Sequence, residues 1–331
     1  MHGPWIISGP LAAVELAVLG APSGESKDYG TLPLRSFVAS LERLAAFAAG
    51  DGAAVWRAGE TLSLVHLGAI GAAMAAAPTL GAALRCFVTY FGTVQSSTAI
   101  GLEQEGDLVH LHYRILDETI WPRRADAELT LGIVASTVRR YAPDAPRAIT
   151  VQFEGPERGS NRGIEMRLQR PVRRGDDNCL TIPARLMDAP LPDPAAPQAA
   201  VDFRDCLQQL SRNLSAMRAL QPVSDRVRDL LLDQTGKGPT DQDSVARALA
   251  MSRRTLRRKL EAEGTSFHEL GEACRCSIGQ ALLTRTDLPI VEIAIRLGYS
   301  DHTAFSRAFS RWCGVPPRVL RKGLWGDSDR I

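Results

Sequence analysis

The sequence predicts a protein of two parts: an α+β domain built of helices and a small antiparallel sheet, followed by an all-α domain with two helix–turn–helix motifs. Three observations lead to this prediction. Helical and alternating apolar spacings both occur in the first part, whereas only helical spacing occurs in the last third. Four prolines stand within residues 189–197, as expected of a linker. A pattern of small and hydroxyl residues also occurs twice near the end of the chain.

The first part contains helical segments that alternate with strand-like runs. We expect residues 1–27 to be a weakly ordered leader and residues 28–192 to form the first domain. Helices are predicted over 34–48, 64–74, 80–91 (capped by Thr79) and 122–141. Strands are predicted over 99–102 and 108–115, joined as a hairpin, and near 148–153, 164–169 and 178–182. This order indicates an α+β domain and not repeated βαβ units.

A Pro-rich linker and a connecting helix are predicted over residues 193–222. The helix, expected over 200–218, carries one apolar stripe whose members are spaced four and three residues apart in turn: Phe203, Leu207, Leu210, Leu214 and Met217. Such a seam is typical of paired helices. Two interpretations stay open, because the stripe can pack on its own domain or on a second copy of the chain.

The second domain is predicted over residues 223–324, with a tail at 325–331. Its first motif places Ala246 four residues before Ala250, and Ser252 opens the next helix as N-cap. Its second motif repeats this with Ala294, Gly298 and Ser300. The small residues allow a close helix contact and a tight turn, and the second copy is one residue longer. Two such motifs suggest a monomer that reads two neighbouring major-groove segments of DNA.

Charge is concentrated on the first of these motifs. The chain has a formal net charge of +2, but residues 223–331 hold 18 Lys and Arg against 14 Asp and Glu. Five of these positive charges lie within Arg253–Lys259. A dense basic helix of this kind is suited to a polyanion, and Arg can read guanine bidentately.

Several classes of protein are excluded. The six cysteines, at 86, 179, 206, 274, 276 and 313, show no disulfide or zinc spacing, so we expect reduced thiols in a cytoplasmic protein. His110 and His112 share a strand face but lack a third ligand, so no metal is expected. No secretion signal or membrane-spanning stretch is present, and no catalytic or cofactor motif occurs. We therefore expect no enzyme, no cofactor and no membrane partner.

Residues 223–322 resemble the DNA-binding domain of the AraC/XylS family of bacterial transcription regulators. The resemblance is carried by Met251–Leu260, Pro289–Ser300 and Phe305–Pro317. It implies seven helices, two recognition helices held by the long helix 266–285, and contact with RNA polymerase. The implied base-reading residues are Arg254, Arg257, Arg258, His302, Thr303 and Arg307. Expected phosphate contacts are Ser252, Arg253, Lys259, Ser300, Ser306, Arg311, Arg318 and Arg321.

Residues 28–192 resemble, more loosely, the arabinose-binding-domain type of sensor found in some of these regulators. The match rests on Ala77–Arg85, the hairpin around Glu105–Asp107 and the helix start Ala125–Leu129. It implies binding of an unidentified small molecule or of a second protomer. Trp121, Arg123 and Arg124 are the predicted effector contacts. The sequence thus predicts a ligand-responsive regulator that binds promoter DNA as a homodimer; alternatively, the first domain only dimerises and binds no effector.

Overall fold

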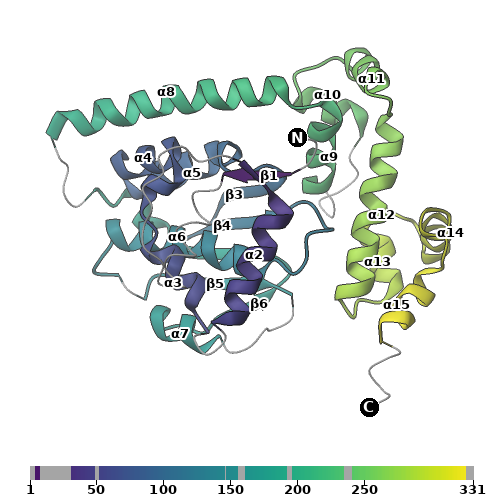
Figure 1. Cartoon of the computed structure of the whole chain (residues 1–331), viewed down its shortest axis with the longest axis horizontal. Helices are drawn as coiled ribbons and strands as arrows, with labels where there is room; N and C mark the ends of the chain where they lie inside the picture. The colour runs from purple at the N-terminus through teal and green to yellow at the C-terminus, as the bar shows by residue number, and fades with distance from the viewer. Residues whose placement is uncertain are drawn as a thin grey trace. The chain divides into compact units, whose positions relative to one another are not determined.

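The chain folds into two compact units, Met1–Ala219 and Leu220–Ile331 (Figure 1). The computed structural model describes residues 4–7, 31–48, 52–145, 147–155, 161–191, 196–234 and 241–325. Most of the predicted leader, the start of the predicted linker and nearly all of the predicted tail lie outside these residues.

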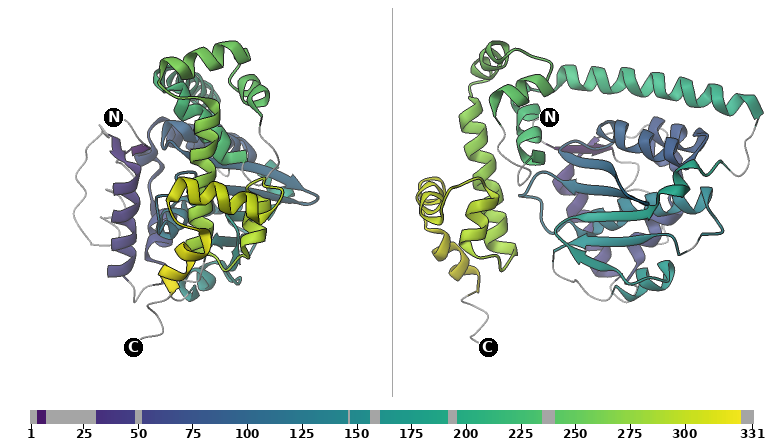
Figure 2. Two further views of the ribbon diagram at one scale, coloured as in Figure 1. Left: turned by 90° about the vertical axis from the view of Figure 1, so that its right-hand side faces the viewer. Right: turned by 180° about the vertical axis from the view of Figure 1, so that it is seen from behind.

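The N-terminal unit is built on a five-stranded sheet in the order β3-β4-β7-β5-β6. Its strands are β3 (Thr98–Glu105), β4 (Leu108–Ile115), β5 (Thr150–Glu154), β6 (Arg173–Gly175) and β7 (Asn178–Pro183). All neighbours run antiparallel except β5 and β6, which are parallel. Figure 2 shows the sheet from behind in its right-hand view. The predicted small antiparallel sheet is therefore confirmed, with one parallel pair at its edge.

Alternation along β4 explains which face of the sheet is buried. Val109, Leu111, Tyr113 and Ile115 are at most 3% exposed and belong to the core, whereas the residues between them are half-buried. The predicted hairpin joins β3 to β4 at Gly106, whose φ of +56° suits glycine.

Helices complete this core. They are α2 (Leu34–Phe47), α3 (Ala54–Thr61), α4 (Ala69–Ala76), α5 (Leu80–Tyr90) and α6 (Arg124–Tyr141), with short 3₁₀ helices at Leu64–Leu67, Phe91–Thr93 and Ala184–Asp188. The Thr79 hydroxyl accepts from the amide of Ala82 at 3.1 Å and caps α5 as predicted. Two glycines let α3 and α6 approach closely, because a Cβ on Gly59 would lie 2.4 Å from the Leu129 carbonyl oxygen and one on Gly132 would lie 2.6 Å from that of Trp56.

The prediction of a strand over 164–169 is wrong. These residues lie mainly in α7 (Arg162–Leu168), in which Ile164 and Leu168 are buried and Met166 is 70% exposed. Ile164 and Leu168 fit a strand face and a helix face equally well, because they are four residues apart. Only the exposure of Met166 separates the two interpretations.

The structure also contains elements that the sequence did not predict. The strands β1 (Trp5–Ile7) and β2 (Thr31–Pro33) pair antiparallel, so part of the predicted leader is ordered. Helix α3 was not predicted either. Helix α3 is buried by packing against α6, which lies some seventy residues later in the chain. The spacing of apolar residues within α3 is therefore weak evidence for a helix.

Helix α8 (Ala196–Leu220) is the connecting helix, and it runs beside α4 and α5 in Figure 1. The predicted stripe faces the N-terminal unit: Leu210 is 1% exposed, and Phe203 and Leu207 pack against the core. Tyr90 of α5 and Ser211 of α8 share a hydrogen bond of 2.8 Å between their hydroxyl groups. The stripe thus packs against the N-terminal unit of its own chain. Its pairing with a second copy stays a prediction.

The C-terminal unit has seven helices in its described residues: α9 (Val223–Gln234), α10 (Gln242–Ala248), α11 (Arg253–Ala262), α12 (Phe267–Arg285), α13 (Ile290–Arg296), α14 (His302–Cys313) and α15 (Pro317–Trp325). Helix α12 contacts α9, α13, α14 and α15. Its Gly279 is buried, and a Cβ added there would lie 3.4 Å from both Leu297 and Phe305, an ordinary contact distance.

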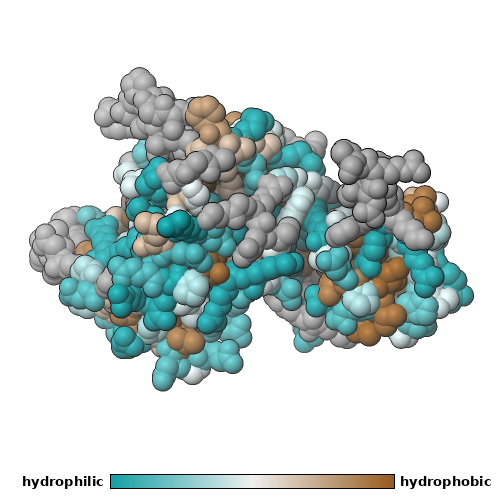
Figure 3. All heavy atoms as spheres, turned by 90° about the horizontal axis from the view of Figure 1, so that it is seen from below, coloured by the Kyte–Doolittle hydropathy of each residue, from teal (hydrophilic) through white to brown (hydrophobic). Residues whose placement is uncertain are grey.

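The surface is largely hydrophilic on the face shown in Figure 3. The large hydrophobic residues of the C-terminal unit that are at least half exposed include Leu220, Val291, Ile295 and Val319. Among the described helices, none combines the length and the apolar character that crossing a membrane requires.

Candidate nucleic-acid interface

The first helix–turn–helix consists of α10 and α11. Its turn is closed by two backbone bonds, from Met251 N–H to the Ala246 carbonyl at 2.8 Å and from Ala250 N–H to the Arg247 carbonyl at 2.9 Å. Ala250 has a φ of +54°, so it lies in the left-handed region. The Ser252 hydroxyl then accepts from the amide of Thr255 at 3.1 Å and caps α11 as predicted.

The second motif, α13 and α14, repeats this turn bond for bond. Tyr299 N–H donates to the Ala294 carbonyl and Gly298 N–H to the Ile295 carbonyl, both at 2.9 Å. Gly298 takes the left-handed position with a φ of +81°. Ala246 and Ala294 are both at most 2% exposed, which agrees with their predicted role at the helix contact.

The prediction that Ser300 caps the second recognition helix is wrong. Asp301 is the N-cap: its Oδ1 accepts from the amides of Thr303 and Ala304, each at 2.8 Å. These amides lower the pKa of the Asp301 carboxyl. The second copy has one extra residue between the turn and the helix, so the cap moves from the position of Ser252 to the next residue. A carboxylate is also favoured at the positive end of a helix.

Replacing Ala250 by Gly is expected to stabilise the C-terminal unit by about 0.5–1 kcal/mol. Glycine removes the steric cost of the left-handed conformation, and its greater freedom in the unfolded chain offsets only part of that gain. Chemical denaturation of the full chain measures the change. Ala246→Gly is the matched control, because this alanine is buried in α10 and glycine there costs about 1 kcal/mol. Equal losses in the free energy of unfolding for Ala250→Gly and Ala246→Gly would contradict the left-handed role of Ala250.

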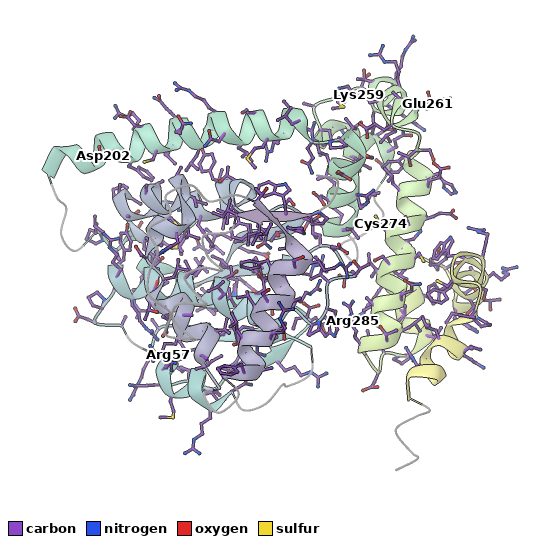
Figure 4. The ribbon with its side chains drawn as sticks, in the orientation of Figure 1. Arg57, Asp202, Lys259, Glu261, Cys274 and Arg285 are labelled. Carbon is purple, nitrogen blue, oxygen red and sulfur yellow. The ribbon has the colours of Figure 1, made fainter. Side chains whose placement is uncertain are left out.

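All six predicted base-reading residues are exposed on the two recognition helices. Leu256 and Leu260 bury one face of α11, and Phe305 and Phe309 bury one face of α14. The base-reading residues lie on the remaining faces: Arg254, Arg257, Arg258, His302, Thr303 and Arg307. Figure 4 marks α11 by Lys259 and Glu261, both exposed. Each recognition helix therefore presents polar side chains to an incoming ligand.

Some predicted contact residues have partners within the unit. Arg257 donates to Glu261 at 2.7 Å, Arg253 lies 3.6 Å from Asp243, and Arg311 is paired with Glu272. These arginines are 65–76% exposed, so the pairs are weak and a phosphate or base can replace the carboxylate. Within the described part of the chain, Arg254, Arg258 and Arg307 have no ion-pair partner.

The predicted phosphate contacts differ in accessibility. Ser252, Arg253, Lys259, Ser300, Arg311 and Arg318 are exposed, and Ser306 is half-buried. Arg321 is also half-buried and donates to the Leu288 carbonyl at 2.7 Å. Arg321 thus links α15 to the segment before α13, and its guanidinium is less available to DNA than the others.

The predicted effector contacts are internal to the N-terminal unit, which does not support that prediction. Arg123 is 3% exposed; it binds Glu154 through two nitrogens at 2.6 and 3.0 Å and the Ile115 carbonyl at 2.7 Å. Burial alone would lower the pKa of Arg123, but Glu154 and Glu118 outweigh it and raise that pKa. The Arg124 guanidinium stacks on Phe153 at 3.5 Å and donates to Glu128 at 2.7 Å. Trp121 lies beside Arg123, 5.7 Å from its guanidinium.

Sequence reasoning missed a buried polar network next to these residues. Asp126 accepts a hydrogen bond of 2.6 Å from the Tyr113 hydroxyl, which in turn accepts one of 2.9 Å from Gln95. Burial raises the pKa of Asp126 to about 7, although the Tyr113 bond partly opposes the shift. The signal available in the sequence was an acidic residue in the first turn of a helix, flanked on both sides by alanine.

The two histidines on β4 have separate partners. His110 Nδ1 lies 2.9 Å from the Thr181 hydroxyl, and His112 Nδ1 lies 2.5 Å from Asp177 Oδ2. Hydrogen bonds with Asp177 and Cys179 raise the pKa of His112 to about 10. Among the described residues, no group of three or more His, Cys, Asp or Glu side chains has an arrangement that could hold a metal ion.

Known protein families match both units of the chain. A family model described as the arabinose-binding domain of AraC transcription regulators, N-terminal part, matches residues 16–191, and a helix-turn-helix domain model matches residues 245–323. The HTH-type transcriptional regulator Rv1395 of Mycobacterium tuberculosis is 28% identical over 85% of this chain and 81% of its own length. VqsM, an HTH-type transcriptional regulator of Pseudomonas aeruginosa, is 26% identical over 78% and 80%.

Two further similarities are partial or distant. The ornithine utilization regulator of Pseudomonas aeruginosa is 35% identical over 43% of this chain and 41% of its own length. The crystal structure of the transcriptional regulator CdpR from Pseudomonas aeruginosa is 25% identical and covers 95% of this chain and 96% of that chain, with a TM-score of 0.41.

Proposed function

This chain belongs to the AraC family of transcription regulators, and on that basis we propose that it reads two adjacent major-groove segments of a promoter in response to a small molecule. It is a DNA-binding regulator with an arabinose-binding-like sensor domain and not an enzyme. What we propose beyond this is which side chains read DNA and how the sensor domain acts.

The observation that carries the proposal is the repetition of one turn geometry in front of two exposed polar helices. The bonds from Met251 to Ala246 and from Tyr299 to Ala294 close the turns before α11 and α14 in the same way, and α14 begins one residue later after its turn than α11 does. A helix held so that its N-terminal turns are exposed can enter the major groove. Arg254 and Arg258 on α11 and Arg307 on α14 would then read bases, and Lys259 and Arg318 would contact phosphates.

In the proposed mechanism the effector changes a conformational equilibrium. Its binding to the N-terminal unit would favour the arrangement of domains or protomers that can occupy both half-sites. The homodimer, the contact with RNA polymerase and a cytoplasmic location are parts of the same proposal that rest on resemblance to the family. The alternative is a sensor-like unit that only dimerises. The internal pairing of Arg123 and Arg124 makes that alternative more serious, because two of the three predicted effector contacts are engaged within the unit.

Selection of genomic fragments by the purified full chain at physiological salt tests the proposal. We expect an enriched sequence on which each protomer protects two major-groove patches about one helical turn apart. Thermal-shift screening with amino acids, including ornithine because one relative is named for its utilization, then separates the two versions of the sensor. A stabilising compound that also changes the footprint supports effector control. No enrichment with or without such a compound would overturn the double-reader proposal.

Replacing Lys259 by Gln is expected to weaken binding to selected and random DNA alike. Lys259 is exposed on α11 and is proposed to neutralise one phosphate. Its loss should make the slope of log affinity against log salt concentration shallower by about 0.9. Filter binding at several salt concentrations measures this slope. Glu261→Gln is a control from the same helix, because it removes a negative charge and frees Arg257. An unchanged salt slope in the Lys259→Gln variant would argue against the phosphate contact of Lys259.

A further inference from the structure

Two cysteines from different helices of the C-terminal unit lie in contact. The Sγ atoms of Cys276 on α12 and Cys313 on α14 are 3.5 Å apart, although 37 residues separate them in the chain. The Gln280 side-chain amide, one turn after Cys276, donates to the Cys313 sulfur at 3.2 Å. A disulfide requires an S–S distance of about 2.0 Å, so a small movement of the side chains or of the helix end would allow the bond.

This pair is more accessible than three of the other four cysteines of the chain; the fourth, Cys206, is half-buried in the other unit. Cys86, Cys179 and Cys274 are buried, whereas Cys276 and Cys313 are both partly accessible to solvent. Cys274 also lies on α12 (Figure 4), but it is only 5% exposed and belongs to the buried side of that helix. Burial and the neighbouring thiol raise the pKa of Cys276 to about 12.

We propose that Cys276 and Cys313 form a redox-sensitive pair whose disulfide locks the second recognition helix to α12. Hydrogen peroxide, a two-electron oxidant, would convert one of the two thiols to a sulfenic acid and release one water. The sulfur of the other cysteine, 3.5 Å away, then attacks that sulfur, the S–S bond forms, and a second water leaves. The two thiols lose two electrons and two protons in all, and peroxide is reduced to two waters. A thiol reductant reverses the change.

The position of the pair gives the bond a consequence for DNA reading. Cys313 is the last residue of α14, the helix that carries His302, Thr303 and Arg307. Shortening the sulfur–sulfur distance by about 1.5 Å draws this helix end toward α12. The exposed edge of α14 then shifts relative to α11, and the two helices no longer match adjacent groove segments. This step rests on the proposed function; formation of the disulfide does not.

Peptide mass spectrometry of the full chain, before and after treatment with hydrogen peroxide, tests the chemistry. We expect a disulfide-linked pair of peptides containing Cys276 and Cys313, which dithiothreitol removes. Cys313→Ser and Cys276→Ser should each abolish it, while Cys206→Ser, which removes a half-buried thiol of the other unit, should leave it unchanged. If peroxide instead oxidises these cysteines separately, or links other pairs, the proposal is overturned.

DNA binding by the same samples tests the consequence. On the fragment recovered by genomic selection, oxidation should weaken binding roughly tenfold, about the loss of one bidentate base contact. The Cys313→Ser protein should bind equally well with and without peroxide. A disulfide without any change in affinity would overturn the switch. Failure of the reduced protein to select any DNA would count against the proposed function and not against the thiol pair.

Discussion

Replacing Arg123 by Ala is expected to destabilise the N-terminal unit by about 3–5 kcal/mol, the usual cost of removing one partner of a buried ion pair. The Arg123 guanidinium is 3% exposed and neutralises Glu154 and Glu118, whose side chains are 19% and 10% exposed. Without it, both carboxylates stay in a poorly solvated place and the Ile115 carbonyl loses its donor. Chemical denaturation, with hydrogen exchange in β4 and α6 to isolate this unit, measures the loss.

Arg140→Ala is the matched control for this experiment. Arg140 lies near the end of α6, the helix that Arg123 precedes, but it is exposed and donates to the Ala75 carbonyl at 3.3 Å. We expect a change within about 0.5 kcal/mol. The pair of variants also tests the effector site predicted from the sequence. If Arg123→Ala left stability unchanged and abolished the response to an effector, Arg123 would be a ligand contact and its structural role would be refuted.

Replacing Arg307 by Ala is expected to reduce affinity for the selected promoter fragment about 10- to 100-fold, with little effect on random DNA. Arg307 is exposed on α14, next to Thr303 one turn earlier, and has no ion-pair partner among the described residues. Its guanidinium is thus free to bind a guanine edge bidentately. The enriched sequence should lose its preference at one base pair only, and repeating the selection with the variant measures this directly.

Arg311→Ala, one turn further along α14, is the control. Arg311 is paired with Glu272 of α12 in the free protein, so a phosphate has to replace that carboxylate. We expect a modest and equal weakening on selected and random DNA, with unchanged base preference. Arg257→Ala should behave as Arg307→Ala does, because its bond to Glu261 is exposed and easily exchanged. Equal losses of affinity for selected and random DNA in the Arg307→Ala variant would show that Arg307 contacts a phosphate and does not read a base.

Short-range patterns predicted most of the C-terminal unit. The cap at Ser252, the tight turns at Ala250 and Gly298 and the buried faces of α11 and α14 depend on residues within a few positions of each other. The misplaced cap at Ser300 shows the limit of copying one motif onto another. One inserted residue moved the role to Asp301, and both residues are good caps when considered alone.

The N-terminal unit was predicted less completely, for a physical reason that Ile164–Leu168 illustrates. A short run with apolar residues at every second position fits a strand and a helix equally well, and packing decides between them. Strands β1 and β2 are only three residues each, and neither has a signal without its partner.

Local spacing and side-chain chemistry predicted the two-part architecture and the repeated helix–turn–helix motif, and the resemblance to a known family indicated the six exposed residues that are proposed to read bases. Which charged groups and thiols come into contact depends instead on the packing of the folded chain. The fold pairs Arg123 with Glu154, Arg311 with Glu272 and Cys276 with Cys313, which are 31 to 39 positions apart in the sequence. Ion pairs and thiol contacts require atoms to approach within a few ångströms, and that approach is set by how whole helices and strands pack, which no local pattern records.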